Sequence, residues 1–502
     1  MSATTVELAR LERIVDTAGI SEPIEALLPV GVRARQLSVR TLLLGMLLVA
    51  CDGRPAHLTR VHQALTALRE SDQRRLGVLA PDSTGSHRLT YRQIEYTFTR
   101  ITRALSKSTP DGAPSELLSA ILDRLLEASV QVAGEPASSS LTVDWTDQEA
   151  WARPPSKGHA RPSRDPEAAW GHRTTNHPAQ NEAFFGYYLQ ALTTVRDERG
   201  PDVPEFVRRI HLASCRHDPP AQIVPVLERM HQHGIAPADL LADSGYSYRQ
   251  PDTFALPLRA LGVQLIIDLH PNDRGPKSTH MGAIAANGNL YCPATPPSLL
   301  HLGPLPPAAS IEQTAAHDQQ CSELHHYKLA PLTGYDQDGY RRVACPATQQ
   351  KLRCPLRPES LTLPHDRPPP HHPPEHPPRC CTQQTITVPP AVNTKTAQKH
   401  DYPSAAHRRS YQRRTAAERS FATVTDTATT NLTRGWTRLT GLTPIALLTT
   451  AASIARNLRI HDAFHAKQAE NQRRAANGLP PKHRKRRRHT TEDLISTGNP
   501  PP

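Results

Sequence analysis

The sequence predicts a mixed α/β protein that begins with an all-helical region. Three observations predict this class. Residues 1–130 carry apolar side chains at helical spacing, residues 139–272 alternate strand-like and helix-like runs, and helical spacing returns over residues 401–476 after a proline-rich stretch. At roughly 100–200 residues per domain, a chain of this length holds about three domains.

Four segments account for the helical prediction in the N-terminal region. They are LARLERIVDTAG, QLSVRTLLLGMLLVACDG, LTRVHQALTALRESD and TYRQIEYTFTRITRALSK. Ser38 and Thr90 stand where an N-cap side chain accepts a free N–H group of the first turn. Small helical domains in this position often bind DNA, and a purely structural packing domain is an equal alternative. No helix-turn-helix pattern stands out.

Residues 139–272 are expected to form a mixed sheet in the order β-β-β-α-β-α-β. Strands are expected in SLTVDWTD, FFGYYLQALTTV, FVRRIHLASC, DLLADSGY and VQLIIDLHP. Helices are expected in AQIVPVLERMHQHG, which Asp218 and two prolines open, and in QPDTFALPLRALG. The polar, proline-rich residues 153–181 are expected to form a loop.

Residues 273–400 interrupt this alternation with clusters of glycine, proline and histidine. Their most extreme part, PHDRPPPHHPPEHPP at 364–378, cannot bury a core and is predicted to be an extended or disordered linker. A strong helical pattern resumes in SAAHRRSYQRRTAAERSFATV and continues to about residue 476. In the tail, residues 477–502, the run KHRKRRRH is a block of like charge that is expected to be solvated.

The charge of the chain favours an anionic partner. The formal net charge is +12, and residues 395–493 carry 20 Lys and Arg against seven Asp and Glu. The remainder is therefore close to neutral. A neutral body with a basic C-terminal quarter is typical of nucleic-acid binding, and a solubilising tail is the alternative.

Several features favour a reducing cytoplasm, and the bias toward Ala, Arg and Pro is typical of a GC-rich bacterial genome. The start, MSATTVELARLER, contains an acidic residue and no apolar run, so no signal peptide is expected. The apolar runs at 41–51 and 439–455 suit buried helices better than membrane spans. Eight cysteines in 502 residues are too sparse for a secreted disulfide scaffold.

Three acidic residues occupy positions that suit a metal-dependent site. Asp144 lies in the strand LTVDWTD, on the face opposite Leu141 and Val143. Asp243 ends the strand DLLAD, and the carboxyl ends of strands are where α/β sheets form sites. Glu418 lies in the helix after the proline-rich segment. Carboxylates are preferred ligands of Mg²⁺, and two such ions about 3.5–4 Å apart stabilise both oxygens of a phosphodiester displacement.

A tyrosine and an arginine precede Glu418 at helical spacing. Tyr411, Arg414 and Glu418 stand at i, i+3 and i+7, within about 60° on one helix face. Arg414 would then hold a DNA phosphate near the metals. A plain surface ion pair between Arg414 and Glu418 is the alternative, although arginine before glutamate is the less favourable order.

With these residues the chain resembles the DDE transposases of bacterial insertion sequences, in the branch marked by a Tyr-x2-Arg-x3-Glu-x6-Lys signature. The matching residues are Asp144, Asp243, Tyr411, Arg414 and Glu418. The resemblance covers about residues 139–460. It implies a ribonuclease-H-like catalytic domain with a large insertion before the glutamate helix, here residues 273–400, and 401–476 as its C-terminal part. The lysine of the signature is replaced by Thr425.

The resemblance implies metal-dependent DNA cleavage and strand transfer, that is, phosphodiester hydrolysis followed by transesterification. Asp144, Asp243 and Glu418 would hold Mg²⁺ or Mn²⁺, and Tyr411 and Arg414 would bind DNA. The N-terminal helices and the basic C-terminal region would bind the terminal inverted repeats of the element, with target DNA as second substrate and a homodimer in the synaptic complex. A nucleoid-associated, cytoplasmic location follows. The alternatives are a metal-dependent nuclease without strand transfer and a non-catalytic, decayed or domesticated DNA-binding protein.

Two assignments stay open at the level of sequence. Asp147 competes with Asp144 for the first catalytic position, and Asp268 is a lesser competitor of Asp243. Four cysteines also allow a test for zinc. They are Cys345, Cys354, Cys380 and Cys381. Their spacing departs from the paired C-x2-4-C pattern of zinc sites, so the sequence favours ordinary reduced thiols over a zinc site.

Overall fold

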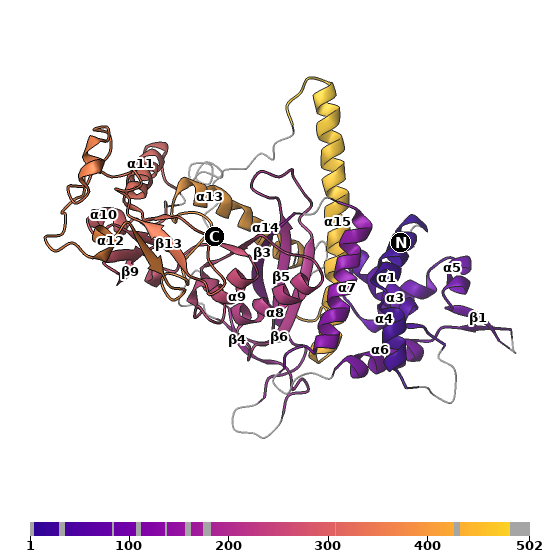
Figure 1. Cartoon of the computed structure of the whole chain (residues 1–502). Helices are drawn as coiled ribbons and strands as arrows, with labels where there is room; N and C mark the ends of the chain where they lie inside the picture. The colour runs from indigo at the N-terminus through magenta and orange to yellow at the C-terminus, as the bar shows by residue number, and fades with distance from the viewer. Residues whose placement is uncertain are drawn as a thin grey trace, which may run out of the picture.

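The computed structural model describes residues 5–29, 36–82, 85–106, 112–135, 138–155, 162–173, 182–306, 308–425 and 432–481. A six-stranded mixed sheet lies at the centre, with the N-terminal helices on one side and a smaller strand-rich region on the other (Figure 1). The prediction of a mixed α/β protein with a helical N-terminal region is confirmed.

The N-terminal region combines helices with one β-hairpin. Its described elements are α1 (Thr5–Ala18), α2 (Ser21–Leu27), α3 (Val39–Cys51), α4 (Leu58–Thr66), α5 (Glu70–Arg75), β1 (Leu79–Asp82), β2 (Gly85–Arg88), α6 (Tyr91–Leu105) and α7 (Glu116–Ala133). Both expected caps form: the Ser38 hydroxyl accepts a backbone N–H, and Thr90 forms a capping box with Gln93. The prediction of an all-helical region was wrong at the hairpin, where a proline and a run of polar residues replace the helical spacing of apolar side chains.

The strands of the central sheet run in two directions. They are β3 (Ser140–Glu149), β4 (Ala169–His172), β5 (Ala183–Val195), β6 (Val207–Ser214), β7 (Asp239–Ala242) and β8 (Gln264–Ile267). Strand β5 is antiparallel to β3 on one edge and to β6 and β4 on the other, whereas β3, β7 and β8 are parallel neighbours. The order across the sheet is therefore β6-β5-β3-β7-β8. Strand β4 was missed because its four residues lie in a polar stretch, and its Trp170 remains 52% exposed.

Helices cover both faces of this sheet. On one face, α8 (Pro219–Gln232) and α9 (Ala255–Ala260) pack on Leu141 and Val143. On the other face, α14 (Thr415–Thr425) packs on β3 and β5, whereas α7 and α15 (Leu442–Ala476) contact β6. Because side chains alternate along a strand, Asp144 lies on the α14 face, opposite Leu141 and Val143.

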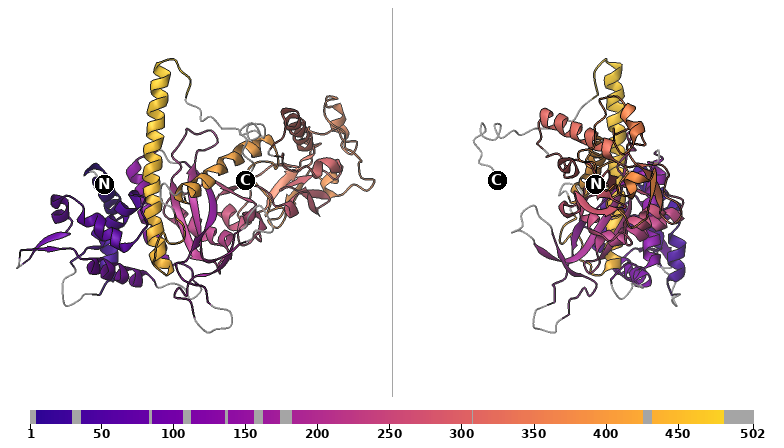
Figure 2. Two further views of the ribbon diagram at one scale, coloured as in Figure 1. Left: turned by 180° about the vertical axis from the view of Figure 1, so that it is seen from behind. Right: turned by 60° about the vertical axis from the view of Figure 1, so that its left-hand side comes forward.

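The N-terminal helices, α15 and the sheet share one hydrophobic core. The first half of α15 is buried from Leu442 to Leu458, and its later turns project beyond the body (Figure 2). The apolar run in α3 is buried in the same core, so packing is continuous across the predicted boundary near residue 130. No helix in the described part of the chain is long and apolar enough to cross a membrane. The basic run at 482–489 lies outside the described residues.

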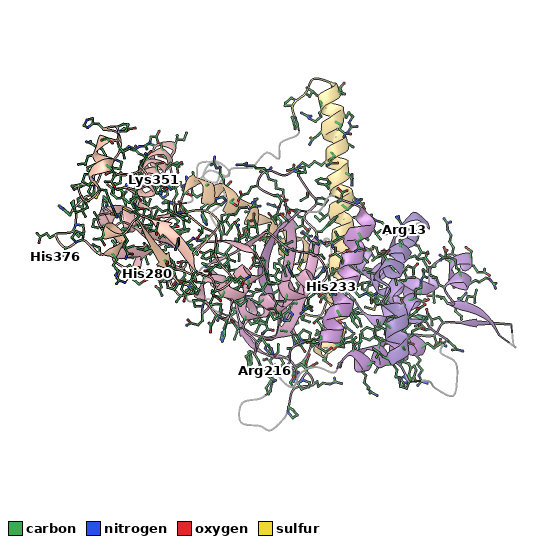
Figure 3. All side chains as sticks on the ribbon, viewed as in Figure 1. Arg13, Arg216, His233, His280, Lys351 and His376 are labelled. Carbon is green, nitrogen blue, oxygen red and sulfur yellow. The ribbon has the colours of Figure 1, made fainter. Side chains whose placement is uncertain are left out.

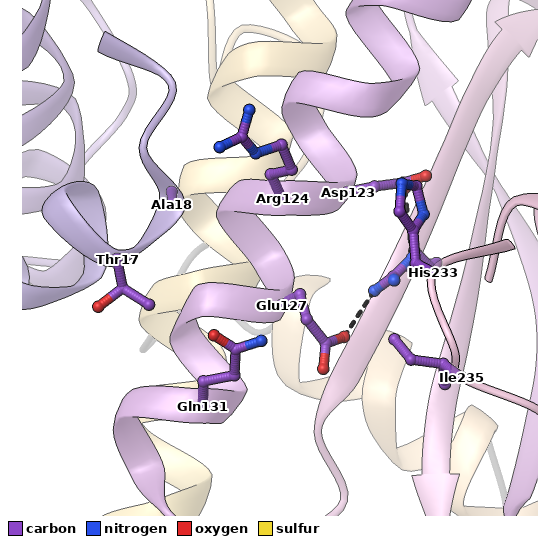
Figure 4. A pocket seen from close by; sticks show the side chains of 9 residues that line it. Thr17, Ala18, Asp123, Arg124, Glu127, Gln131, His233 and Ile235 are labelled. Carbon is purple, nitrogen blue, oxygen red and sulfur yellow. Dashed lines mark hydrogen bonds and ion pairs between the residues drawn. The ribbon is translucent and has the colours of Figure 1, made fainter. Parts of the chain in front are cut away.

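A buried cluster of charges joins α7 to strand β6 and to α8. Asp123 and Glu127 lie one turn apart on α7 (Figure 4). Arg209 of β6 lies 2.8 Å from a Glu127 oxygen and 3.5 Å from an Asp123 oxygen, and Arg229 of α8 donates to Asp123 at 3.1 Å. The Arg209 and Asp123 side chains are only 2% and 3% exposed. These pairs fix α7 against the sheet, with Asp123 and Arg209 buried and Glu127 and Arg229 partly exposed at the edge of the cluster.

Residues 273–400 form a folded region with two small antiparallel sheets. Its strands are β9 (Pro276–His280), β10 (Ala283–Ala286), β11 (Asn289–Tyr291), β12 (Ala330–Pro331), β13 (Arg341–Ala344) and β14 (Thr385–Val388), and its helices are α10 (Pro297–Leu300), α11 (Ile311–Tyr327) and α12 (Arg379–Thr382). Two small buried clusters support these sheets. Residues 273–400 therefore contain a packed unit, although the proline- and histidine-rich stretch 364–378 contributes no residue to the two clusters.

The proline- and histidine-rich segment 364–378 is held against this unit. It has no helix or strand, as expected, and His376 lies at its outer end (Figure 3). However, His371 N–H donates to the Ala294 carbonyl at 2.9 Å, and the Tyr327 hydroxyl donates to a carbonyl of the segment at 2.9 Å. Only Pro370 of this segment is buried, which agrees with the prediction of an extended stretch that buries no core, and proline carbonyls serve as acceptors for the bonds that hold it.

Candidate active site

The parallel pairing of β3 and β7 brings the two predicted aspartates to one edge of the sheet. Thr142 of β3 is opposite Leu241 of β7 in the ladder. Asp144 and Asp243 each follow two residues after this pair, so they lie next to each other just beyond the β3–β7 ladder. Strand β7 ends at Ala242, so Asp243 follows the strand instead of ending it.

Asp243 caps a short 3-10 helix, Ser244–Tyr248. Its Oδ1 accepts the N–H of Gly245 at 2.9 Å, which fixes the direction of the carboxylate. A side chain at Gly245 would meet the Trp145 ring at 2.6 Å, so the close approach of this turn to β3 requires glycine. The Trp145 and Tyr246 rings meet edge to face, 5.0 Å apart. Aromatic packing thus joins the two elements that carry the aspartates.

Glu418 lies in the first turn of α14. The predicted continuous helix is divided: α13 (Ala405–Tyr411) leads through a 3-10 turn, Gln412–Arg414, into α14. The Thr415 hydroxyl donates to the Gln412 carbonyl at 3.1 Å, a local bond that accompanies the tighter turn. The Glu418 side chain is 56% exposed, so it faces the open side of the site.

Arg414 connects the first and third predicted acids. Its Nη1 lies 3.4 Å from Asp144 Oδ2, and its Nη2 donates to Glu418 Oε1. The guanidinium also lies over the Tyr411 ring, 5.8 Å from its centroid, and His407 stacks on that ring at 5.6 Å. The surface-pair alternative for Arg414 and Glu418 is therefore incomplete, because Arg414 is mostly buried and reaches a second acid.

Burial disfavours the charged forms of both aspartates. Burial, together with the nearby charge of Asp243, raises the pKa of Asp144 to about 6, although Arg414 opposes this effect. Burial also raises the pKa of Asp243, against the opposing effects of Arg414 and of the N–H groups that the carboxylate accepts. Burial raises the pKa of Tyr411, which therefore stays neutral. The site concentrates negative charge that a cation would relieve.

The competing acids have other partners. Asp147 lies on the opposite face of β3 and pairs with Arg173 at 2.7 Å. Asp268 follows β8 and accepts the Tyr402 hydroxyl at 2.8 Å. Its charge contributes to the raised pKa of Asp243, so Asp268 borders the site. The geometry favours Asp144 for the first position, because Asp144 shares Arg414 with Glu418.

The donor set suits a hard divalent cation. Asp144, Asp243 and Glu418 offer only oxygen ligands, the preference of Mg²⁺ and Mn²⁺. Their oxygens do not all lie within 4.8 Å of one another among the described residues, and the Arg414 guanidinium lies between two of them. A positive charge thus already occupies the space where a cation would balance the carboxylates.

The four cysteines that the sequence marked for a zinc test lie in two neighbouring clusters. Cys345 and Cys354 are buried in one, and Cys380 and Cys381 in the other, with their sulfurs 4.0 Å apart. No three thiols in the described residues lie within 4.8 Å of one another. Burial, with the nearby thiols of Cys345 and Cys381, raises the pKa of Cys354, which stabilises its protonated form. The arrangement fits reduced core cysteines.

One potential metal site was missed at the level of sequence. Glu135, His461 and His465 converge at the side of α15, and the signal that could have found them is the i, i+4 spacing of the histidines in HDAFH.

No known family model matches the chain, and no curated protein or solved structure matches it.

Proposed function

We propose that this protein is a DDE-type DNA transposase with a ribonuclease-H-like catalytic domain. When β4 is left out and the other five strands are numbered 1 to 5 along the chain, their order across the sheet is 3-2-1-4-5. Strands 1, 2 and 3 are antiparallel to their neighbours, and strands 4 and 5 run parallel to strand 1. This order supports a ribonuclease-H-like domain. Residues 273–400 stand between its last strand and α14, which supports their assignment as an insertion before the glutamate helix.

A single observation carries the proposal: three acids from three separate elements lie around one arginine, which contacts Asp144 and Glu418 and whose charge acts on Asp243. Asp144 comes from β3, Asp243 from the turn after β7, and Glu418 from α14. Asp144 senses the charges of both other acids and of Arg414. Such an arrangement costs stability through burial and repulsion, and functional sites are where such costs are commonly tolerated.

Asp144, Asp243 and Glu418 would hold Mg²⁺ or Mn²⁺ in this site. Bound ions would make a water or a DNA 3′-hydroxyl a stronger nucleophile and stabilise the charge that develops on the phosphate. Arg414 would exchange its contacts with Asp144 and Glu418 for a DNA phosphate, guided by the Tyr411 ring below it. The partners would be terminal inverted repeats and target DNA, bound by a homodimer with the N-terminal helices and the basic C-terminal region.

The test is cleavage of labelled DNA that carries the ends of the element, with Mg²⁺ or Mn²⁺ and with the wild type and Glu418→Gln. Nicking at the element boundary that needs metal and is lost in the variant would support the proposal. Joining of the freed 3′ end to a second DNA would separate a transposase from a nuclease. Binding without nicking by the wild type would instead support the non-catalytic alternative.

The Mg²⁺ requirement should rise in acidic solution. A metal ligand must be deprotonated, and Asp144 has a pKa raised to about 6. Below this pH a proton competes with the ion, so the half-saturating Mg²⁺ concentration should increase by about tenfold per pH unit. Cleavage measured over a Mg²⁺ series at pH 5, 6 and 7.5 tests this. A half-saturating concentration that stays constant from pH 7.5 to 5 would contradict it.

Arg414→Ala should weaken binding of element ends by about 10-fold or more, since a hydrogen bond to a charged group is worth about 1.5–3 kcal/mol. The slope of log affinity against log salt concentration should also become less steep by about one unit, the contribution of one phosphate contact. Equilibrium binding at several salt concentrations measures both. The matched control is Arg409→Ala, an exposed arginine on α13, which should change affinity less than threefold. Equal losses in both variants would remove the specific role of Arg414.

A further inference from the structure

A second cluster of potential metal ligands lies where α15 leaves the protein core. His461 and His465 are one turn apart on α15, and Glu135 follows the end of α7. Glu135 Oε1 lies 3.5 Å from His461 Nε2 and in direct contact with His465 Nε2. The ligand atoms of these three side chains all lie within 4.8 Å of one another.

The chemistry of this cluster differs from that of the acidic site. Two imidazole nitrogens and one carboxylate oxygen are a frequent ligand set of Zn²⁺, whereas Mg²⁺ prefers oxygen ligands alone. Histidines at i and i+4 present both rings on the same face of a helix. Tetrahedral ligands with bonds of about 2.0–2.2 Å stand roughly 3.4 Å apart, close to the separation of Glu135 Oε1 from His461 Nε2.

The surroundings of His461 support a metal ligand at its Nε2. Asp462 Oδ1 lies 3.1 Å from His461 Nδ1, and the Arg10 guanidinium donates to the same carboxylate at 2.8 Å. When Nδ1 carries the proton and donates it to this carboxylate, the Nε2 lone pair is free for a metal. Arg10 Nη2 also lies 2.9 Å from Nδ1 and can only donate to it, so metal binding at Nε2 requires Nδ1 to give up Arg10 for Asp462, while Arg10 keeps its own bond to Asp462. Phe206 stacks on the imidazole and limits its rotation.

We propose that Glu135, His461 and His465 bind one Zn²⁺ ion, with a water molecule as fourth ligand. The ion joins the end of α7 to the exposed part of α15, since α15 is buried up to Leu458 and largely exposed beyond it. The direction in which this helix projects from the body (Figure 2) is then fixed by metal coordination as well as by the apolar contacts of its first half.

The test is a Zn²⁺ titration by calorimetry on the full chain after removal of metals with a chelator. The wild type should show one tight site that His465→Gln weakens by more than about 100-fold, because even loss of a residue that only supports a ligand costs 10–100-fold. His465 is half exposed, so its replacement should leave the fold intact. His231→Gln, an exposed histidine on α8, is the matched control and should keep the site.

A second measurement is independent of calorimetry. One equivalent of Zn²⁺ should raise the thermal midpoint of the wild type and of Asp144→Asn, and not that of His465→Gln, because a ligand that binds only the folded state stabilises it. Retention in Asp144→Asn separates this site from the acidic one, so either proposal can fail alone. Equal Zn²⁺ binding by the wild type and His465→Gln, or no tight site in the wild type, would leave only a histidine–glutamate ion pair and overturn the proposal.

Discussion

Asp144→Asn is expected to reduce metal-dependent DNA cleavage by at least about 1,000-fold while making the protein more stable. The loss follows because an amide is a poor substitute for a charged ligand, and a metal contributes several kcal/mol to a phosphoryl transition state, with each 1.36 kcal/mol worth tenfold in rate. Single-turnover cleavage of DNA with the element ends, at pH 7.5 and saturating Mg²⁺, measures this loss.

The gain in stability follows from the raised pKa of Asp144. The folded state holds its proton more tightly than the unfolded state does, with a pKa of about 6 against 3.8. The cost of the charged form is therefore absent below pH 3.8, grows as the pH rises, and is complete above pH 6. At 1.36 kcal/mol per unit, the neutral variant gains up to about 3 kcal/mol at pH 7.5. Thermal unfolding should show a higher midpoint for Asp144→Asn at pH 7.5 and no difference near pH 3.5.

The matched control for this variant is Asp147→Asn, the same change on the same strand. Asp147 lies on the opposite face of β3 and pairs with Arg173 at the surface, so cleavage should change less than threefold and stability by less than about 1 kcal/mol. Loss of cleavage in Asp147→Asn with normal activity in Asp144→Asn would reverse the assignment of the first acid. Loss of both activity and stability in Asp144→Asn would point to a structural role.

The central sheet was largely predictable because its strands have strong local signals. Alternation along LTVDWTD placed Asp144 opposite Leu141 and Val143, and the structure has this arrangement. Strand β4 and the β1–β2 hairpin were not predictable, since each strand has four residues without a clear apolar pattern. Pairing with longer neighbours or with each other, and not local preference, forms such strands.

The candidate site was predictable only as a set of residues. The sequence placed an acid on a strand, an acid near the end of another and an acid on a helix, but not their distances. The bridge that Arg414 forms between Asp144 and Glu418 depends on the packing of α14 on β3, which joins residues 270 positions apart. The 3-10 turn before α14 also escaped prediction, because the helical pattern of its residues is unbroken in sequence.

Asp123→Ala is expected to destabilise the protein by about 3 kcal/mol, the largest loss of stability that we predict. Asp123 is almost fully buried between Arg209 and Arg229, and removal of one partner from a buried ion pair costs about 3–5 kcal/mol because the other charge stays behind without compensation. The lower end applies because Arg209 keeps Glu127 at 2.8 Å. For a unit of 150–250 residues this corresponds to a fall of about 6 °C or more in the thermal midpoint.

The control is Glu70→Ala, which removes an exposed i,i+4 ion pair with Arg74 on α5 and should cost less than about 0.5 kcal/mol. Both variants remove an acidic side chain of a helix from an ion pair with arginine, so the difference between their effects on stability measures the effect of burial. Thermal unfolding of the two variants beside the wild type decides the matter, and equal midpoints would show that water reaches Asp123. Because Asp123 joins α7 to the sheet and α8, its loss should also expose the chain between α7 and β3 to protease. Cleavage there would show that the N-terminal helices separate from the central sheet before the sheet itself unfolds.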